Sequence, residues 1–153
     1  MNNPQPPLGF LGGAFAPVHI GHLRGAMAVR DKLNLERVDL IPAAASPLKD
    51  QATVDAMHRL AMLERAVADL HGVAVDAREL DRPGPSYTAD TLAGLRYEYG
   101  AERTLVWIIG ADILATLPRW SRWRELLEFA HIVVIGRPNA EPHPPEVSAW
   151  LED

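Results

Sequence analysis

The sequence predicts an α/β fold, a three-layer sandwich in which helices cover both faces of a parallel sheet of about five strands. Short apolar runs alternate along the chain with amphipathic segments of helical length. Residues 104–109 are almost uninterruptedly apolar, which is typical of a central parallel strand buried on both faces. A glycine pair, Gly12-Gly13, separates the first apolar run from the first helical pattern. That order indicates a strand, a tight turn and a helix.

Composition limits the class of protein. A length of 153 residues suits one domain with a substantial core, and 48% hydrophobic residues with a mean hydropathy of −0.07 indicate a globular chain. There are no cysteines, so disulfides and thiolate metal sites are excluded. No apolar run approaches the roughly 20 residues that span a bilayer, and residues 1–7 do not resemble a secretory signal. The net charge of −5 argues against nucleic-acid binding. We therefore expect a cytoplasmic protein with neither nucleic-acid nor membrane partners.

The first strand and helix outline a nucleotide site. The strand starts at Leu8, and a helix is expected over 20–33. Glycines let the backbone approach a ligand closely, and the N–H groups at a helix N-terminus attract anions. His19 and His22 are three residues apart, so on a helix they share a face and can converge on one phosphate. Such a pair can stabilise charge that develops on a transferring phosphoryl group.

Residues 12–23, GGAFAPVHIGHL, resemble the H-x-G-H signature of the nucleotidylyltransferase superfamily. The longer pattern is similar to the opening of bacterial nicotinate-mononucleotide adenylyltransferases, with Ala14 and Ala16 where that family has Thr and Asp. The bare tetrapeptide also occurs in class I aminoacyl-tRNA synthetases. In the adenylyltransferases this segment binds ATP and the two histidines are catalytic. The resemblance therefore implies an ATP site at Gly12, Gly13, Ala14, Phe15, His19 and His22, joined by Gly110 and Asp112 from a later strand end.

The next segment contains a strand at 38–41, a loop at 43–50, a helix at 55–70 and a strand at 73–75. Met57, Leu60, Leu63, Val67 and Leu70 are expected to form the buried stripe of that helix. The family carries Pro-His-Lys or Pro-His-Arg in the loop, where this chain has Pro47-Leu48-Lys49. Lys49 is a candidate phosphate ligand by resemblance, and a solvated loop lysine otherwise.

Residues 78–92 match the family's E-L-x-R…S-Y-T-x-D-T-L motif at every named position. The residues alone predict a proline-rich loop and a helix capped by Thr88 and ended by Gly100. The resemblance implies that Ser86, Tyr87 and Thr88 hold the nicotinate nucleotide. Both interpretations can hold, because a cap and an anion site use the same N–H groups.

The strand at 104–109 ends in Gly110-Ala111-Asp112, where ligands of such sheets bind. Asp112 is either a ligand to a ribose or base, or a helix N-cap. Residues 117–123 are similar to the family's L-P-x-W-x-x-W, which makes Trp120 the candidate to stack on a pyridine ring, while Trp123 is expected in the core.

A last strand is expected at 131–135, followed by Arg137-Pro138, an Arg-Pro pair that the family has near the nucleotide. We divide the chain into a nucleotidylyltransferase domain at 8–138 and a proline-rich tail at 139–153. The family's I-S-x-T-x-I-R segment is expected to be absent, as in a C-terminally shortened member. His58, His71 and His143 do not have the spacing of a metal site.

The resemblance implies a Rossmann-like nucleotidylyltransferase fold with sheet order 3-2-1-4-5 and a site between the first and fourth strands. It implies adenylyl transfer from ATP to nicotinate mononucleotide, which forms nicotinate adenine dinucleotide and pyrophosphate in NAD biosynthesis, with Mg²⁺ on the triphosphate. Two alternatives stay open. One is a nucleotide-binding domain with impaired catalysis, and the other is an H-x-G-H relative with another acceptor, such as phosphopantetheine. A tRNA synthetase fragment is less favoured, because the chain is acidic and lacks K-M-S-K-S. Oligomeric state and the choice between acid and amide are left open.

Overall fold

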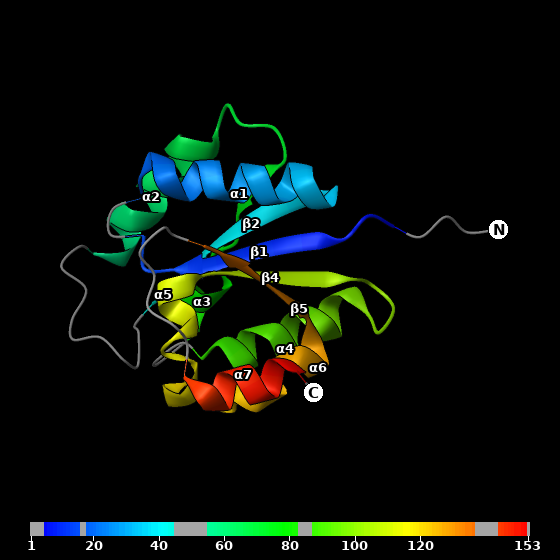
Figure 1. Cartoon of the computed structure of the whole chain (residues 1–153). Coiled ribbons are helices and arrows are strands. Elements are labelled where there is room, and N and C mark those ends of the chain that lie inside the picture. Colours follow the sequence, from blue (N-terminus) through cyan, green and yellow to red (C-terminus); the bar gives the residue numbers. More distant parts are fainter. Residues whose placement is uncertain (1–4, 16–17, 45–54, 83–86, 137–143, 153) are drawn as a thin grey trace.

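The computed structural model describes residues 5–15, 18–44, 55–82, 87–136 and 144–152. Its centre is a sheet with helices on both faces: α1 and α2 lie on one side, and α4, α6 and α7 on the other (Figure 1). The strands are β1 (Leu8–Gly13), β2 (Arg37–Pro42), β3 (Val73–Val75), β4 (Leu105–Gly110) and β5 (His131–Ile135). The helices are α1 (Ile20–Leu33), α2 (Ala56–Val67), α3 (Arg78–Asp81), α4 (Thr88–Tyr99), α5 (Ala111–Leu114), α6 (Leu126–Phe129) and α7 (Pro145–Glu152), with 3₁₀ turns η1 (Leu117–Arg119) and η2 (Trp123–Glu125).

The sheet has five parallel strands in the order β3-β2-β1-β4-β5, which confirms the predicted fold and strand order. β1 lies at the centre, with Gly12 opposite Ile41 of β2 and Phe10 opposite Trp107 of β4. The chain reverses its direction of winding between β1 and β4. In such sheets the crevice for a ligand opens beyond the carboxyl ends of those two strands.

Two apolar layers hold the helices on the sheet. Alternate residues of each strand face opposite sides, so Phe10 and Trp107 pack against α4 while Val106 and Ile108 pack against α1 and α2. Leu105 to Ile109 are all buried, as expected for a central strand. Trp123 is also buried, at 6% exposure, which confirms its predicted place in the core.

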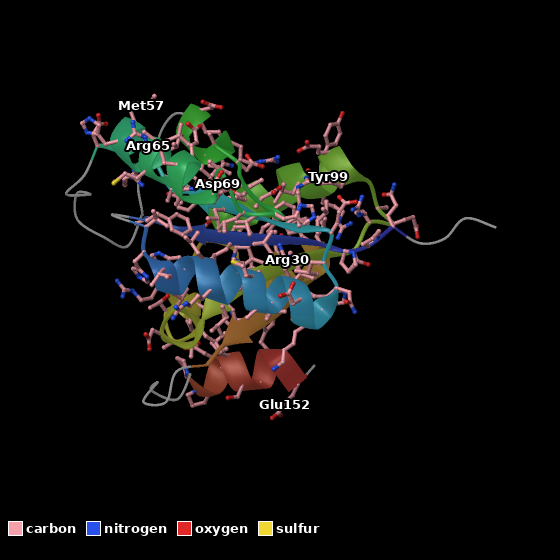
Figure 2. The ribbon with its side chains drawn as sticks, turned by 90° about the horizontal axis from the view of Figure 1, so that it is seen from above. Arg30, Met57, Arg65, Asp69, Tyr99 and Glu152 are labelled. Carbon is pink, nitrogen blue, oxygen red and sulfur yellow. The ribbon has the colours of Figure 1, made fainter. Side chains whose placement is uncertain are left out.

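Helix α2 departs from its predicted stripe. It covers Ala56–Val67 rather than 55–70, and Asp55 is its N-cap. Met57, predicted to be buried, is 66% exposed and lies at the periphery of the molecule in Figure 2. The buried residues of α2 are Arg59 and Leu63, which are four positions apart and so share a face. Met57 projects away from that face, and a charged residue takes a position inside the stripe.

The C-terminal helix α7 packs on the α4 side of the sheet. Val147 is fully buried there, and Trp150 meets Trp123 edge-on with ring centroids 5.2 Å apart. The indole Nε1 of Trp150 donates to the carbonyl oxygen of Arg124. This segment therefore adds a layer to the core, although the division of the chain at residue 138 stays a prediction. None of the described helices is both long and apolar enough to cross a membrane.

Candidate active site

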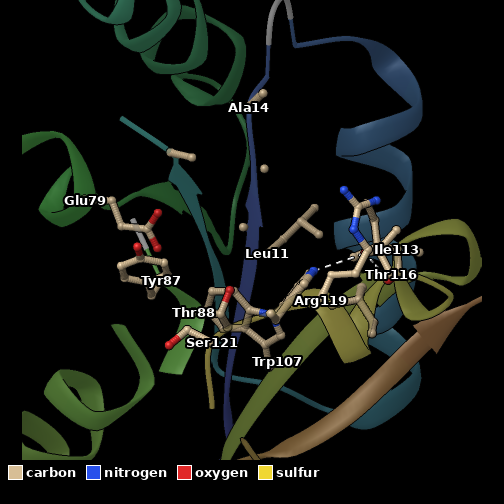
Figure 3. Close-up of a pocket in the computed structure, with 16 residues that line it drawn as sticks. Leu11, Ala14, Glu79, Tyr87, Thr88, Trp107, Ile113, Thr116, Arg119 and Ser121 are labelled. Carbon is tan, nitrogen blue, oxygen red and sulfur yellow. Dashed lines mark hydrogen bonds between the residues drawn. The ribbon is translucent and has the colours of Figure 1, made fainter. Parts of the chain in front are cut away.

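A pocket of about 370 Å³ opens at the carboxyl ends of β1 and β4. Its floor is formed by the ends of the two strands, and Figure 3 shows Glu79 and Tyr87 on one side of β1 and Ile113, Thr116 and Arg119 on the other. This is the position predicted for the site. The lining comprises Leu11, Gly12, Gly13, Ala14, Ala43, Glu79, Tyr87, Thr88, Trp107, Ile109, Gly110, Ile113, Thr116, Arg119, Trp120 and Ser121.

Gly12 is required at the pocket floor by a close approach of β4. A Cβ built on Gly12 would lie 2.7 Å from Cζ2 of the Trp107 indole, and Trp107 is only 2% exposed. A Cβ on Gly13 would meet the Phe15 ring at 3.5 Å, which is ordinary van der Waals contact. The neighbouring glycines therefore differ in how strictly they are needed.

We expect Gly12→Ala to destabilise the protein by about 1–3 kcal/mol, because a buried indole must shift to admit the methyl group. The shifted ring would also enter the pocket, since Trp107 lines it. Gly13→Ala is the matched control and should change stability by no more than about 0.5 kcal/mol. Denaturant unfolding of both variants measures the difference. Equal effects at the two positions would contradict this account of the floor.

The two histidines form the start of α1. His19 is the N-cap, and its Nδ1 accepts from the N–H of Gly21 at 3.1 Å. The backbone N–H of His19 donates to Nδ1 of His22, also at 3.1 Å, and the rings stack with centroids 3.6 Å apart. Because both Nδ1 atoms accept hydrogen bonds, a neutral ring at either position carries its proton on Nε2. The pair therefore presents two Nε2–H donors side by side.

Phe15 links residues 12–14, called the glycine segment below, to the histidine pair. Its ring is buried at 3% exposure and meets His22 edge-on with centroids 4.9 Å apart. Its backbone φ is +48°, in the left-handed region. That conformation costs a non-glycine residue roughly 1–2 kcal/mol. Such strain persists only where surrounding contacts enforce it.

The wall that contains Tyr87 is built on the N-terminus of α4. Tyr87, rather than Thr88, occupies the N-cap position, and it makes no side-chain capping bond within the described part of the chain. The first N–H groups of the helix therefore lie beside the pocket, where Tyr87 and Thr88 line it. The predicted cap by Thr88 was wrong by one residue, because Thr88 is already helical.

Helix α3 is fastened to α4 beside this wall. Thr91 Oγ1 donates to Glu79 Oε2 at 2.7 Å, and Arg82 Nη2 donates to Thr91 Oγ1 at 2.6 Å. Glu79 is 5% exposed and lines the pocket. The E-L-x-R and T-x-D-T-L portions of the motif thus meet in space and place a carboxylate at the pocket edge.

Trp120 lies in the opposite wall with its indole fixed at one edge. Its Nε1 donates to Thr116 Oγ1 at 3.1 Å (dashed line in Figure 3), and Thr116 Oγ1 donates to the carbonyl oxygen of Ile113 at 2.7 Å. Trp120 is partly buried against the core and also lines the pocket. An indole held in this way can receive a flat ring from the pocket side.

The predicted site residues fall into three groups. Gly12, Gly13, Ala14, Gly110, Tyr87, Thr88 and Trp120 come together around the pocket. Phe15, His19, His22 and Asp112 are not in the lining of the described pocket, although the ring of Phe15, which follows Ala14, contacts His22. Asp112 is exposed in the first turn of α5, whose N-cap is Gly110. Lys49, Ser86 and Arg137 lie outside the described residues. The functional roles of all these residues stay predictions.

Several lining residues were not singled out from the sequence: Leu11, Ala43, Glu79, Trp107, Ile109, Ile113, Thr116, Arg119 and Ser121. Trp107 and Ile109 are two residues apart in β4, so they share one face of the sheet, which is also the face of Phe10. Strand periodicity would therefore have predicted that Trp107 and Ile109 lie together. Glu79 stands inside the quoted motif. Thr116 has no sequence signal beyond its position four residues before Trp120.

Comparison with known proteins identifies the class. A sequence model of the cytidylyltransferase-like family matches residues 10–151, and the chain belongs to that family. More particularly, it is 48% identical over 139 residues to a protein of Pseudomonas fluorescens named "Probable nicotinate-nucleotide adenylyltransferase", a match that covers 91% of this chain and 65% of that protein. A protein of the same name from Pseudomonas putida is also 48% identical, with 64% of it covered. The predicted resemblance is thus confirmed, and the chain spans just under two thirds of the length of these relatives.

A solved structure supports the fold independently. Plasmodium falciparum nicotinic acid mononucleotide adenylyltransferase, complexed with NaAD, superposes with a TM-score of 0.77 at 14% identity, covering 95% of this chain and 71% of that one. At that level of identity the likeness concerns the fold alone.

Proposed function

We propose that the chain transfers the adenylyl group of ATP to nicotinate mononucleotide, forming nicotinate adenine dinucleotide and pyrophosphate. The observation that carries the proposal is the pocket between β1 and β4, which places the glycine segment, the N-terminus of α4 and Trp120 around one cavity. The 48% identity to proteins named for this reaction supports the choice of substrates.

The acceptor would occupy the pocket. The N–H groups at the start of α4 suit a carboxylate, because a helix N-terminus carries partial positive charge. Trp120 on the opposite wall would stack on the pyridine ring, and a positively charged pyridinium adds cation–π attraction. Together they would fix the ring and its substituent, and so direct the phosphate of the nucleotide toward the glycine segment.

ATP would lie along the glycine segment and the start of α1. There the acceptor phosphate attacks the α-phosphorus in line, and the bond to the leaving pyrophosphate breaks. The stacked His19 and His22 would donate their Nε2–H groups to the oxygens on which charge develops. No side chain needs to form a covalent bond with the nucleotide. Positioning and charge stabilisation supply the catalysis.

A divalent cation, Mg²⁺, would accompany the triphosphate. Among the described residues, no group of three His, Cys, Asp or Glu side chains could hold a metal ion. The fit is therefore to an ion carried by phosphate oxygens, which is how Mg²⁺ usually enters nucleotide sites. The ion would supply charge neutralisation to the triphosphate. A cytoplasmic location stays a prediction.

The test is turnover of the purified chain with ATP, nicotinate mononucleotide and Mg²⁺. We expect release of pyrophosphate together with nicotinate adenine dinucleotide. Phosphopantetheine should not compete with nicotinate mononucleotide for the acceptor site. Nicotinamide mononucleotide, tested alongside, measures the preference between acid and amide. Displacement of nicotinate mononucleotide by phosphopantetheine would instead favour an H-x-G-H relative with another acceptor.

A second candidate is nucleotide binding without catalysis. It is favoured by Ala14, which lines the pocket with a methyl group where the resembling family has a threonine hydroxyl. Calorimetry on the sample used for turnover separates the two functions. Binding of ATP or nicotinate mononucleotide without pyrophosphate release would support the second candidate and contradict the first.

A further inference from the structure

Arg59 is the charged side chain in α2 that the fold buries most completely. It is 1% exposed and lies on the same helix face as Leu63, which is fully buried. Burying a guanidinium costs several kcal/mol unless polar groups receive it. An aliphatic residue would fill this position in an ordinary core helix, so the partners of Arg59 explain its presence.

Two of those partners are backbone carbonyls at the ends of two strands. Nη1 of Arg59 donates to the carbonyl oxygen of Ala14 at 2.7 Å and to that of Ala43 at 2.8 Å. The N–H of Ala43 donates to the carbonyl oxygen of Gly13 at 2.9 Å. One cation thus ties the segment after β1 to the segment after β2, across 45 and 16 residues of sequence. Bonds from a cation are about twice as strong as neutral ones.

The carbonyls that Arg59 binds belong to residues of the pocket, so the contact affects how the pocket would receive a ligand. Ala14 and Ala43 both line the pocket, where carbonyl oxygens would repel an anionic ligand. Arg59 instead holds the two oxygens toward α2. Because a trans peptide directs its C=O and N–H to opposite sides, the N–H of Phe15 then points away from α2.

The same contact bears on the histidine pair. The Ala14–Phe15 peptide leads directly into the left-handed backbone of Phe15, with φ of +48°. The Phe15 ring in turn supports His22 edge-on at 4.9 Å. A continuous path of contacts therefore runs from Arg59 through the peptide and the Phe15 ring to His22.

We propose that Arg59 is a positioning residue, which clamps the carbonyls of Ala14 and Ala43. This clamp holds the glycine segment and the Phe15–His22 contact in a conformation that can bind a phosphate group. Arg59 is not among the residues that line the described pocket. Its part in the reaction rests on the proposed function, whereas its hold on the backbone is independent of it.

The experiment compares Arg59→Met and Arg59→Lys with Leu63→Ala, a buried residue of the same helix that packs in the core. In the wild type and each variant, calorimetry measures ATP affinity and amide hydrogen exchange follows Ala43. We expect Arg59→Met to weaken ATP binding by about ten-fold, because the released carbonyls of Ala14 and Ala43 could turn toward the anionic ligand. Exchange at Ala43 should quicken beyond what its loss of global stability explains, whereas Leu63→Ala should change Ala43 only through global stability.

Arg59→Lys should recover most of both properties. The two acceptors share a single guanidinium nitrogen, and an ammonium group with three donors can serve both. If Arg59→Met does not fold, the lysine variant carries the test, with Ala43 exchange expected to stay near the wild-type rate.

The outcomes separate this inference from the proposed function. If the wild-type protein does not bind ATP, the proposed function is wrong. Selectively faster exchange at Ala43 in Arg59→Met would still support the clamp in that case. Ala43 exchange and ATP affinity in Arg59→Met no different from those in a Leu63→Ala protein of equal stability would overturn the clamp. Loss of Ala43 protection in Arg59→Lys equal to that in Arg59→Met would also overturn it, since the charge would then not be the agent.

Discussion

Replacing His22 by Ala should lower the turnover number of adenylyl transfer by about 10²–10³, the usual cost of removing one donor from a site of developing charge. The ring of His22 stacks on His19 at 3.6 Å, and its Nδ1 accepts from the backbone of His19. In a neutral ring with Nδ1 accepting, the proton is on Nε2, which is the atom that would donate to phosphate oxygen. ATP affinity should fall much less than turnover, because the transition state carries the charge that the ring stabilises.

His22→Gln is the matched control for this change. In a capping box the third helical residue is ordinarily Glu or Gln, so glutamine can keep the bond to the His19 N–H while removing the imidazole. We expect the start of α1 to be retained and turnover to stay as low as in His22→Ala. His58→Ala, at an exposed position of α2, should leave turnover unchanged. Wild-type turnover in His22→Gln would show that the imidazole is not needed to stabilise the developing charge. His22 would then serve only as part of the helix cap.

The layout of the sheet could be predicted because it rests on local patterns. Each strand is a short apolar run bounded by breakers, and right-handed connections leave few possible orders for five parallel strands. The first helix was predicted at its observed bounds, Ile20–Leu33. Its last residue departs from the amphipathic pattern, because the apolar side chain of Leu33 is 43% exposed.

The candidate site was predictable only where motif and geometry coincide. Gly12, Tyr87, Thr88 and Trp120 stand in motifs, and the fold brings them to one pocket. Arg59 was missed because its partners are carbonyls 16 and 45 residues away, which no periodicity reveals. The available signal was a charged residue inside an apolar stripe. Glu79 was missed as a lining residue for a similar reason, since its burial depends on Thr91 of the next helix.

Trp120 separates recognition of the acceptor from catalysis, and its removal is the second large effect that we expect. Trp120→Ala should weaken binding of nicotinate mononucleotide by about 1–3 kcal/mol, the range for stacking of a base on an aromatic side chain. ATP binding should barely change, because ATP would lie against the glycine segment and α1. His19→Ala should weaken ATP binding and spare nicotinate mononucleotide, because it also removes the N-cap that orders the start of α1. Calorimetric titration of each ligand into both variants measures the contrast.

The competing explanation is that Trp120 is mainly a packing residue, since it also contacts the core. In that case Trp120→Ala would lower the melting temperature and weaken both ligands together. Thr116→Val distinguishes the explanations further, because it removes the acceptor of the Trp120 Nε1 bond while nearly keeping the shape of the side chain. If the indole stacks on the pyridine, freeing its edge should weaken nicotinate mononucleotide selectively, by less than Trp120→Ala does. Equal losses for ATP and nicotinate mononucleotide in a destabilised Trp120→Ala protein would rule out the stacking role.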